Sequence, residues 1–198
     1  MQAMQHDDDL DLAQRNRHSR ERKLDRHIAL VGFMGAGKSS IGARLADVLE
    51  RPFYDSDDYV EKLTGNTVQE LFVLGEAEFR SAEAAAVREI VAGPPAVVAL
   101  GGGALQDTTT RALLTQRCFV VHLYLSWADV RTGLPGLSVD RPLLQRPLAE
   151  IHELYLERQR TYRDAHVRIH VPRDDVDKAC ARVMAALRRT DHHATPSD

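Results

Sequence analysis

The amino-acid sequence predicts an α/β fold of three layers (α/β/α), in which helices cover both faces of a five-stranded parallel sheet. Short apolar segments alternate with amphipathic segments along most of the chain, a pattern that is typical of parallel strands joined by helical crossovers. A glycine-rich turn also separates the first apolar segment from the first amphipathic one, as in α/β proteins that bind phosphate groups.

The expected elements follow from this alternation, since strand candidates are short and apolar whereas helix candidates carry apolar residues at helical spacing. The expected strands lie at 28–32, 52–55, 96–100, 118–124 and 167–171. The expected helices lie at 38–50, 57–64, 67–74, 76–92, 107–116, 126–132, 148–164 and 174–189. Ligands of open parallel sheets bind at the carboxyl ends of the strands, so the loops after the strands are the place to look for a site.

Length and composition indicate one domain with polar ends. The 198 residues provide for one hydrophobic core, which we expect within residues 27–190. Residues 1–26 and 191–198 are polar and contain little that a core could bury, so both segments are expected to be disordered. The net charge of −3 gives no global basic character that would favour a nucleic-acid partner.

The sequence also lacks signals for a membrane or for secretion. No apolar run reaches the length of a membrane span, and the first residues lack the basic-then-apolar order of a secretion signal. We therefore expect a cytoplasmic protein without a membrane partner, and a monomer. Cys118 and Cys180 have no metal-binding or redox spacing, so each is expected to be a buried thiol.

The segment from Gly32 to Ser39, termed the phosphate loop below, matches the pattern GxxxxGK[ST]. Its glycines let successive N–H groups turn towards one point, and the following helix directs its positive dipole end there. Lys38 can then reach the β- and γ-phosphates of a nucleotide, and the Ser39 hydroxyl can ligate a bridging Mg²⁺. A chance glycine-rich turn is the alternative, but the flanking strand and helix favour the motif. The other residues expected to contact the nucleotide here are Gly35, Ala36, Gly37 and Ser40.

Two acids follow the second expected strand. At the end of this strand, one of the acids, Asp55 and Asp57, is expected to point toward the phosphate loop and the other toward the space beyond it. This arrangement suits Asp55 as a metal ligand and Asp57 as a partner of an acceptor hydroxyl. The alternative is that both are helix N-caps, a position that Asp favours.

Two further features suggest an acceptor site. Arg80 and Glu83 are three residues apart and share a helix face, so they form either a surface ion pair or a pair in which Arg80 binds a substrate carboxylate. Gly101, Gly102 and Gly103 follow the third expected strand. Consecutive glycines there indicate either a flexible turn or a backbone surface that a ligand touches.

Residues 132–147 are predicted to form a mobile lid. Gly133, Pro135 and Gly136 interrupt a continuous helix, and Arg141 lies at the far side of the interruption. A closing lid excludes water and brings positive charge to a migrating phosphoryl group. The alternative is a surface loop with an unrelated arginine.

Together the motifs resemble the shikimate kinase family, in the nucleoside monophosphate kinase-like group of P-loop proteins. The likeness runs from about Ile28 to Val171 and rests on the ordered segments GFMGAGKSSIG, FYDSDDYVEKLTG, LFVLGEAEFRSAE, VVALGGGAL, DRPLL and ERQRTYR. The resemblance implies a P-loop kinase fold with a mobile lid. It also implies ATP- and Mg²⁺-dependent phosphorylation of the 3-hydroxyl of shikimate, on the route to chorismate and the aromatic amino acids.

The resemblance further implies roles for individual residues on the phosphate side. Lys38 and Arg141 are implied to be catalytic residues that meet the phosphates, and Asp57 to be the acid that orients or deprotonates the acceptor hydroxyl. Ser39 and Asp55 are implied to hold the metal, Asp55 through water.

On the acceptor side, Arg80 and Arg158 resemble the pair that binds the shikimate carboxylate, supported by Glu83 and by the backbone of 101–103. The sequence after Arg158 departs from the family pattern, so Arg160 stays open as the alternative contact.

Towards the base, Arg131 and Arg173 are similar to residues that lie against adenine. The segment between Arg131 and Arg141 is a few residues longer than the lid usual in the family, and Asp140 places a negative charge beside Arg141.

Three rival functions stay open at this stage. A related small-molecule kinase, such as gluconate kinase, has the same architecture. A nucleotide-dependent switch or motor is the rival from another class, although the expected strands 96–100 and 118–124 lack a terminal acidic pair and no NKxD motif occurs. The third rival is an inactive relative that only binds, which the intact Lys38, Ser39 and Asp57 argue against.

Overall fold

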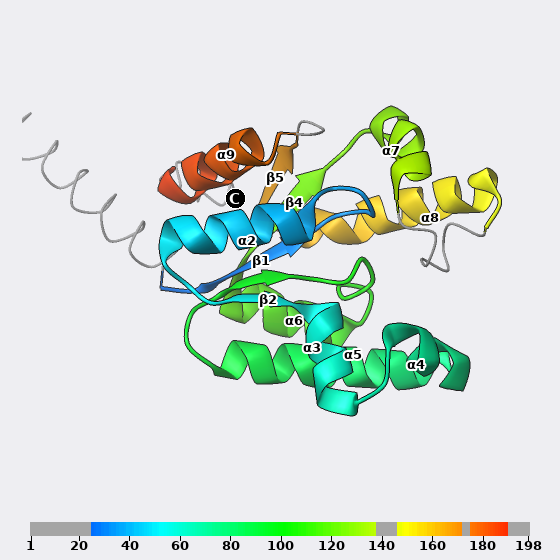
Figure 1. Ribbon diagram of the computed structural model, residues 1–198. Helices are drawn as coiled ribbons and strands as arrows, with labels where there is room; N and C mark the ends of the chain where they lie inside the picture. Colours follow the sequence, from blue (N-terminus) through cyan, green and yellow to red (C-terminus); the bar gives the residue numbers. More distant parts are fainter. Residues whose placement is uncertain (1–24, 138–145, 172–174, 190–198) are drawn as a thin grey trace, which may run out of the picture.

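The computed structural model of the protein describes residues 25–137, 146–171 and 175–189. Its centre is a five-stranded sheet in the order β2-β3-β1-β4-β5, and each neighbouring pair is parallel. This confirms the expected sheet (Figure 1). The strands are β1 (His27–Val31), β2 (Phe53–Asp55), β3 (Val97–Ala99), β4 (Cys118–Tyr124) and β5 (Val167–His170).

Helices connect successive strands, and most of their bounds lie within two residues of the expected ones. The exception is the expected helix 148–164, whose last turn is a separate 3₁₀ helix. The α-helices are α2 (Lys38–Leu49), α3 (Ser56–Thr64), α4 (Val68–Leu74), α5 (Glu76–Ala92), α6 (Thr108–Arg117), α7 (Trp127–Gly133), α8 (Leu148–Thr161) and α9 (Val176–Arg188). The 3₁₀ helices are η1 (Leu134–Gly136) and η3 (Tyr162–Asp164).

The sheet is buried between two layers of helices. In β1 the side chains alternate between two apolar clusters, because successive strand residues point to opposite faces. Ile28 and Leu30 pack with residues of α2 and α9, whereas Ala29 and Val31 pack with residues of α5 and α6. Figure 1 shows these two pairs of helices on opposite sides of the sheet. The three-layer α/β/α prediction is therefore confirmed.

The amino-terminal boundary differs from the prediction. Arg26 was expected in the disordered extension, but its guanidinium donates hydrogen bonds to the carbonyls of Thr115 (2.7 Å) and Gln116 (3.0 Å). These bonds satisfy carbonyls near the end of α6, where unpaired acceptors gather and a cation is favoured. Ordered contacts thus begin before His27, while residues 1–24 and the expected tail 191–198 lie outside the described residues.

The expected lid is described only at its two ends. Residues 132–136 form the end of α7 and the helix η1, and residues 146–147 lead into α8, whereas 138–145 lie outside the described residues. Cys118 and Cys180 are buried and free, as expected. Across the described ranges, no helix is long and apolar enough to cross a membrane.

Candidate active site

The phosphate loop begins where β1 ends and leads directly into α2. Two of its glycines are required by backbone geometry. Gly37 is the N-cap of α2 with φ 73°, and Gly32 has φ 156° and would place a Cβ 2.5 Å from the carbonyl oxygen of Leu123. Side chains at these positions would be strained or would clash. The loop can therefore bring its backbone, rather than side chains, close to an anion at the α2 N-terminus.

The lysine of the loop is directed back over it. Lys38 Nζ donates a hydrogen bond of 3.0 Å to the carbonyl oxygen of Gly32. Below the loop, Ile41 and Leu45 of α2 are almost fully buried and fix the helix against the sheet. The cationic ammonium and the helix N-terminus thus lie at the same end of a rigid element, which is the arrangement needed to hold a polyphosphate.

Asp55 combines two interactions that the sequence presented as alternatives. Its Oδ1 accepts a hydrogen bond of 3.1 Å from the backbone N–H of Asp57, so Asp55 is the N-cap of α3. Its Oδ2 accepts a hydrogen bond of 2.6 Å from the hydroxyl of Ser39, at the start of α2. The cap therefore fixes a carboxylate beside the phosphate loop.

The chemistry of this pair fits Mg²⁺, which is bound by one or two oxygen side chains together with substrate phosphates and water. Within the described part of the chain, no group of three or more His, Cys, Asp or Glu residues could hold a metal by itself. Ser39 and Asp55 are consequently suited to a metal that arrives with a nucleotide.

The three glycines after β3, termed the glycine loop (Gly101–Gly103), bring the acceptor-side residues together. A Cβ on Gly101 would lie 2.7 Å from Glu83 Oε1 and 2.8 Å from Asp57 Oδ1. The N–H of Gly101 donates a hydrogen bond of 2.9 Å to the hydroxyl of Ser56. Glycine is needed here because two carboxylates, from α3 and α5, pack directly on the backbone. Ser56 was not predicted, since its partner is 45 residues away in sequence.

Arg80 lies on the other side of this loop. Its guanidinium forms ion pairs with Glu83 (2.7 Å) and Glu76 (3.3 Å), and it fills the space that a side chain at Gly103 would occupy. The Glu83 side chain is only 4% exposed, so this is not a solvated surface pair. Burial raises the pKa of Glu83, and the adjacent Arg80 guanidinium opposes that shift. The pair holds a cation at the edge of the glycine loop.

Arg158 reaches the same loop from α8. Both its guanidinium and the Tyr162 hydroxyl donate hydrogen bonds to the carbonyl oxygen of Gly102, the tyrosine at 2.9 Å. Burial lowers the pKa of Arg158, and its Nε has no hydrogen-bond partner among the described residues. Arg160 is exposed. The geometry therefore brings Arg158, rather than Arg160, to the acceptor side.

Tyr162 is a site residue that the sequence analysis missed. Its position four residues after Arg158 was an available signal, because residues at that spacing share a helix face. The interaction itself joins residues that are 60 positions apart in sequence, so only the fold reveals it.

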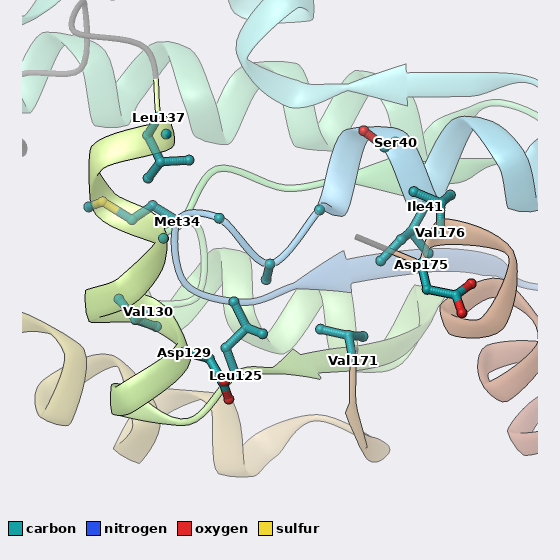
Figure 2. A pocket seen from close by; sticks show the side chains of 15 residues that line it. Met34, Ser40, Ile41, Leu125, Asp129, Val130, Leu137, Val171, Asp175 and Val176 are labelled. Carbon is teal, nitrogen blue, oxygen red and sulfur yellow. The ribbon is translucent and has the colours of Figure 1, made fainter. Parts of the chain in front are cut away.

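A cavity of about 340 Å³ lies beside the phosphate loop, between α7, η1 and the start of α9. Figure 2 shows Val130 and Leu137 on one side of the loop and Val176 on the other. Asp129 and Asp175 add polar groups to walls that are mainly apolar. The volume falls within the range of roughly 300–1,000 Å³ that is usual for small-ligand pockets. Its lining also includes the predicted Gly35, Ala36, Gly37 and Ser40.

The predicted adenine contacts are less well placed. Arg131 lies on α7 but is exposed and is not among the residues that line this cavity. Arg173 and Arg141 lie outside the described residues, although Val171 and Asp175, which flank Arg173 in sequence, do line the cavity. The sequence analysis missed the apolar wall because its residues come from separate segments of the chain, α7, η1 and α9, and apolar residues in helices are ordinarily interpreted as core.

The two loops meet at the centre of the site. A Cβ on Gly102 would lie 4.0 Å from the carbonyl oxygen of Gly32, which is also the acceptor for Lys38. A phosphate held by the phosphate loop and an acidic polyol held at the glycine loop would therefore be neighbours. Such a site can transfer a phosphoryl group by positioning and charge neutralisation, with little covalent chemistry.

Comparisons with known proteins agree with this geometry. A family model described as Shikimate kinase matches residues 34–188. A shikimate kinase of Thioalkalivibrio sulfidiphilus is 38% identical over 87% of this chain and 92% of its own length. A shikimate kinase of Thermus thermophilus is 39% identical over 82% of this chain and 90% of its own length.

Solved structures give the same result. A shikimate kinase from Acinetobacter baumannii, determined in complex with shikimate, superposes with a TM-score of 0.77 and 34% identity, covering 85% of this chain and 96% of the other. With a family model over most of its length and relatives similar over more than four-fifths of it, this chain belongs to the shikimate kinase family.

Proposed function

We propose that the protein is a shikimate kinase, which transfers the γ-phosphoryl group of ATP to the 3-hydroxyl of shikimate on the route to chorismate and the aromatic amino acids. One observation carries this proposal beyond family membership. Asp57, Arg80 and Arg158, from three different helices, all pack on the glycine loop, in which a Cβ on Gly102 would lie 4.0 Å from the carbonyl oxygen of Gly32 in the phosphate loop. An acceptor with a carboxylate and hydroxyls fits such a set of groups.

On the acceptor side, Arg80 and Arg158 are proposed to bind the carboxylate of shikimate. Arginine suits this task because its planar guanidinium can bind a carboxylate through two parallel hydrogen bonds. Glu83 holds Arg80 through their 2.7 Å ion pair, and Gly102 holds Arg158 through its carbonyl. Both cations are thus fixed before substrate arrives, which lowers the entropy cost of binding.

Asp57 is proposed to accept the proton of the attacking hydroxyl or to orient it. Its Oδ1 lies against Gly101, in the same loop on which Arg80 and Arg158 pack, so it can meet a ring hydroxyl of an acceptor whose carboxylate those arginines bind. A carboxylate at this distance from the glycine loop can hydrogen-bond a substrate hydroxyl without moving the backbone. Arg141 is proposed as the lid arginine that meets the phosphates.

On the donor side, the phosphate loop and Lys38 are proposed to hold the β- and γ-phosphates, with the base in the cavity lined by Val130 and Leu137. Ser39 and Asp55 would hold Mg²⁺, which would neutralise phosphate charge when bound. The adenine roles of Arg131 and Arg173 stay proposals. We also propose that the protein is cytoplasmic and monomeric.

The test is ADP release by the full-length protein with ATP and Mg²⁺, measured with shikimate, with gluconate and without acceptor. We expect release that depends on shikimate, while gluconate stays at the level without acceptor. Identification of the product as shikimate 3-phosphate by mass spectrometry completes the test. Equal release with gluconate would show a different acceptor, and release without any acceptor would support a nucleotide hydrolase.

A further inference from the structure

A second cavity, of about 600 Å³, lies between α8, η3 and the strands β4 and β5. We call it the aromatic cavity. Among the described residues that line it, none is Asp57, Arg80 or Arg158, so it is separate from the proposed acceptor site. Its volume is within the range of roughly 300–1,000 Å³ that small-molecule sites occupy.

Aromatic rings form much of its wall. The ring centroids of Trp127 and His152 are stacked at 4.4 Å, and Tyr155 lies 5.5 Å from Trp127. On the strand side, the guanidinium of Arg168 lies 3.5 Å from the centre of the Tyr124 ring. Flat walls of this kind favour a planar ring, which gains contact area and stacking geometry that a puckered ring lacks.

The charge of the cavity has one sign. Arg163 and Arg168 both line it, and none of the described lining residues is an acid. Both arginines are exposed, so they could bind a carboxylate without completely desolvating it. The cavity therefore suits an anion rather than a neutral or cationic molecule.

His122 is a largely buried part of the wall. It is only 2% exposed, and its Nε2 makes no hydrogen bond with any described residue. Because that atom is itself buried, a molecule in the cavity does not reach it. Burial, together with the nearby Arg168, lowers the pKa of His122 to about 4, so the imidazole is neutral near pH 7 and adds no positive charge to the wall.

The aromatic cavity is connected to the acceptor site through one side chain. The ring of Tyr162 lies 4.7 Å from the ring of His122, and the Tyr162 hydroxyl donates to the carbonyl of Gly102 in the glycine loop. A molecule that moves or fixes Tyr162 from the cavity side would alter the carbonyl to which Arg158 also donates.

We propose that the aromatic cavity binds a small aromatic carboxylate, and that its occupancy changes shikimate binding through Tyr162. The carboxylate is bound by Arg163 and Arg168, and the ring lies against the aromatic wall. The binding part of this proposal is independent of the reaction, whereas the effect on shikimate rests on the proposed function.

The probe is 4-hydroxybenzoate, and the readout is fluorescence of Trp127, which is the single tryptophan of the chain and lines the cavity. We expect saturable quenching with excitation at the red edge of the tryptophan band, confirmed by calorimetry. Benzoate keeps the flat ring and the carboxylate and should also bind, whereas cyclohexanecarboxylate, which lacks the flat ring, should bind more weakly than both. Equal affinity for cyclohexanecarboxylate and the two aromatic acids would overturn the proposal.

Three variants distinguish binding in the aromatic cavity from non-specific binding elsewhere on the protein. Arg168→Ala should weaken binding of the probe by roughly tenfold or more, because a charge-assisted contact is lost. Arg88→Ala, an exposed arginine of α5 that does not line the cavity, is the matched control and should bind normally. Arg163→Ala removes the second arginine of the lining and should also weaken binding. Unchanged binding in Arg168→Ala would contradict the proposal.

The effect on the acceptor site is measured with shikimate titrations at zero and at saturating probe. We expect the Kd for shikimate to change by severalfold, the Kd for the probe to change by the same factor when shikimate is saturating, and Tyr162→Phe to reduce both effects. Simple competition, in which the probe's apparent affinity falls without limit as shikimate rises, would place the probe in the acceptor site and overturn the proposal. Because the assay uses binding alone, it stays valid if the kinase activity is absent.

Discussion

The two halves of the proposed active site are built in different ways. The phosphate loop is one continuous segment whose shape comes from backbone geometry, with glycines at φ 156° and 73°. The acceptor side takes single side chains from α3, α5 and α8, which meet only at the glycine loop. A consequence is that the acceptor side can be damaged residue by residue while nucleotide binding is kept.

The largest expected effect comes from Asp57→Asn. It should lower kcat with shikimate by roughly 10²-fold or more, as the loss of a positioned general base does, and leave the Kd for ATP unchanged. The matched control is Asp58→Asn, the next residue of the same helix turn, which should keep most of the activity. Steady-state kinetics and ATP titration of both variants make the comparison. Near-normal turnover in Asp57→Asn would remove Asp57 from its proposed role.

The contrast between the halves also explains what the sequence could predict. The phosphate loop was predictable residue by residue, because its function depends on glycines and a helix start that are adjacent in sequence. Strand and helix bounds were predictable to within about two residues for the same local reasons. Asp57, Arg80 and Arg158, in contrast, were connected only by family resemblance, since no local rule brings three helices to one loop.

The residues that were missed share this property. Ser56 and Tyr162 act through backbone atoms of the glycine loop that are 45 and 60 positions away in sequence. Asp55 was ambiguous for a different reason. One carboxylate has two oxygens, so the cap and the Ser39 contact were never exclusive.

The second prediction concerns Arg80→Ala. Loss of a charge-assisted contact worth about 1.5–3 kcal/mol should raise the KM for shikimate roughly 10- to 100-fold, with the KM for ATP unchanged. Glu83 would be left buried without its partner, so a lower melting temperature is also expected. Arg88→Ala on the exposed face of α5 is the control for both readouts. If the variant loses affinity for ATP but keeps its affinity for shikimate, Arg80 belongs to the phosphate side and not to the acceptor side.

Substitution of two neighbouring glycines tests how the acceptor side is positioned without removing any functional side chain. Gly101→Ala would place a methyl group 2.7–2.8 Å from the carboxylates of Glu83 and Asp57, whereas Gly102→Ala meets nothing nearer than 3.8 Å. Overpacking of this kind costs about 1–3 kcal/mol, so kcat/KM for shikimate should fall roughly tenfold in the first variant. The second variant should be close to wild type, and equal effects in both would show that packing on Gly101 does not position the acids.

On the phosphate side, the two interactions of Asp55, its N-cap of α3 and its contact with Ser39, can be tested separately. Asp55→Asn retains a good N-cap for α3 but removes the charge, so it should raise the Mg²⁺ concentration needed for half-maximal activity by roughly tenfold at unchanged stability. Asp55→Ala removes the cap as well and should cost about 1 kcal/mol of unfolding free energy in urea. If Asp55→Asn shows an unaltered Mg²⁺ requirement, the carboxylate is a cap only.

The last prediction has the smallest expected effect and compares two buried tyrosines. Each donates a hydrogen bond to a backbone carbonyl, one on the acceptor side and one on the phosphate side of the proposed active site. Tyr162 donates to Gly102 and Tyr155 donates to Leu125, both at 2.9 Å, and Leu125 lines the cavity beside the phosphate loop. Replacing Tyr162 by Phe removes its hydrogen bond to Gly102 and should cost about 0.5–1.5 kcal/mol of unfolding free energy. Tyr155→Phe also removes a hydrogen bond with Tyr124 and should cost at least as much. Tyr162→Phe should raise only the KM for shikimate, by a small factor, since Arg158 still binds the Gly102 carbonyl. Tyr155→Phe should instead affect only the KM for ATP, and a shikimate effect in both variants would mean that the halves are coupled through α8.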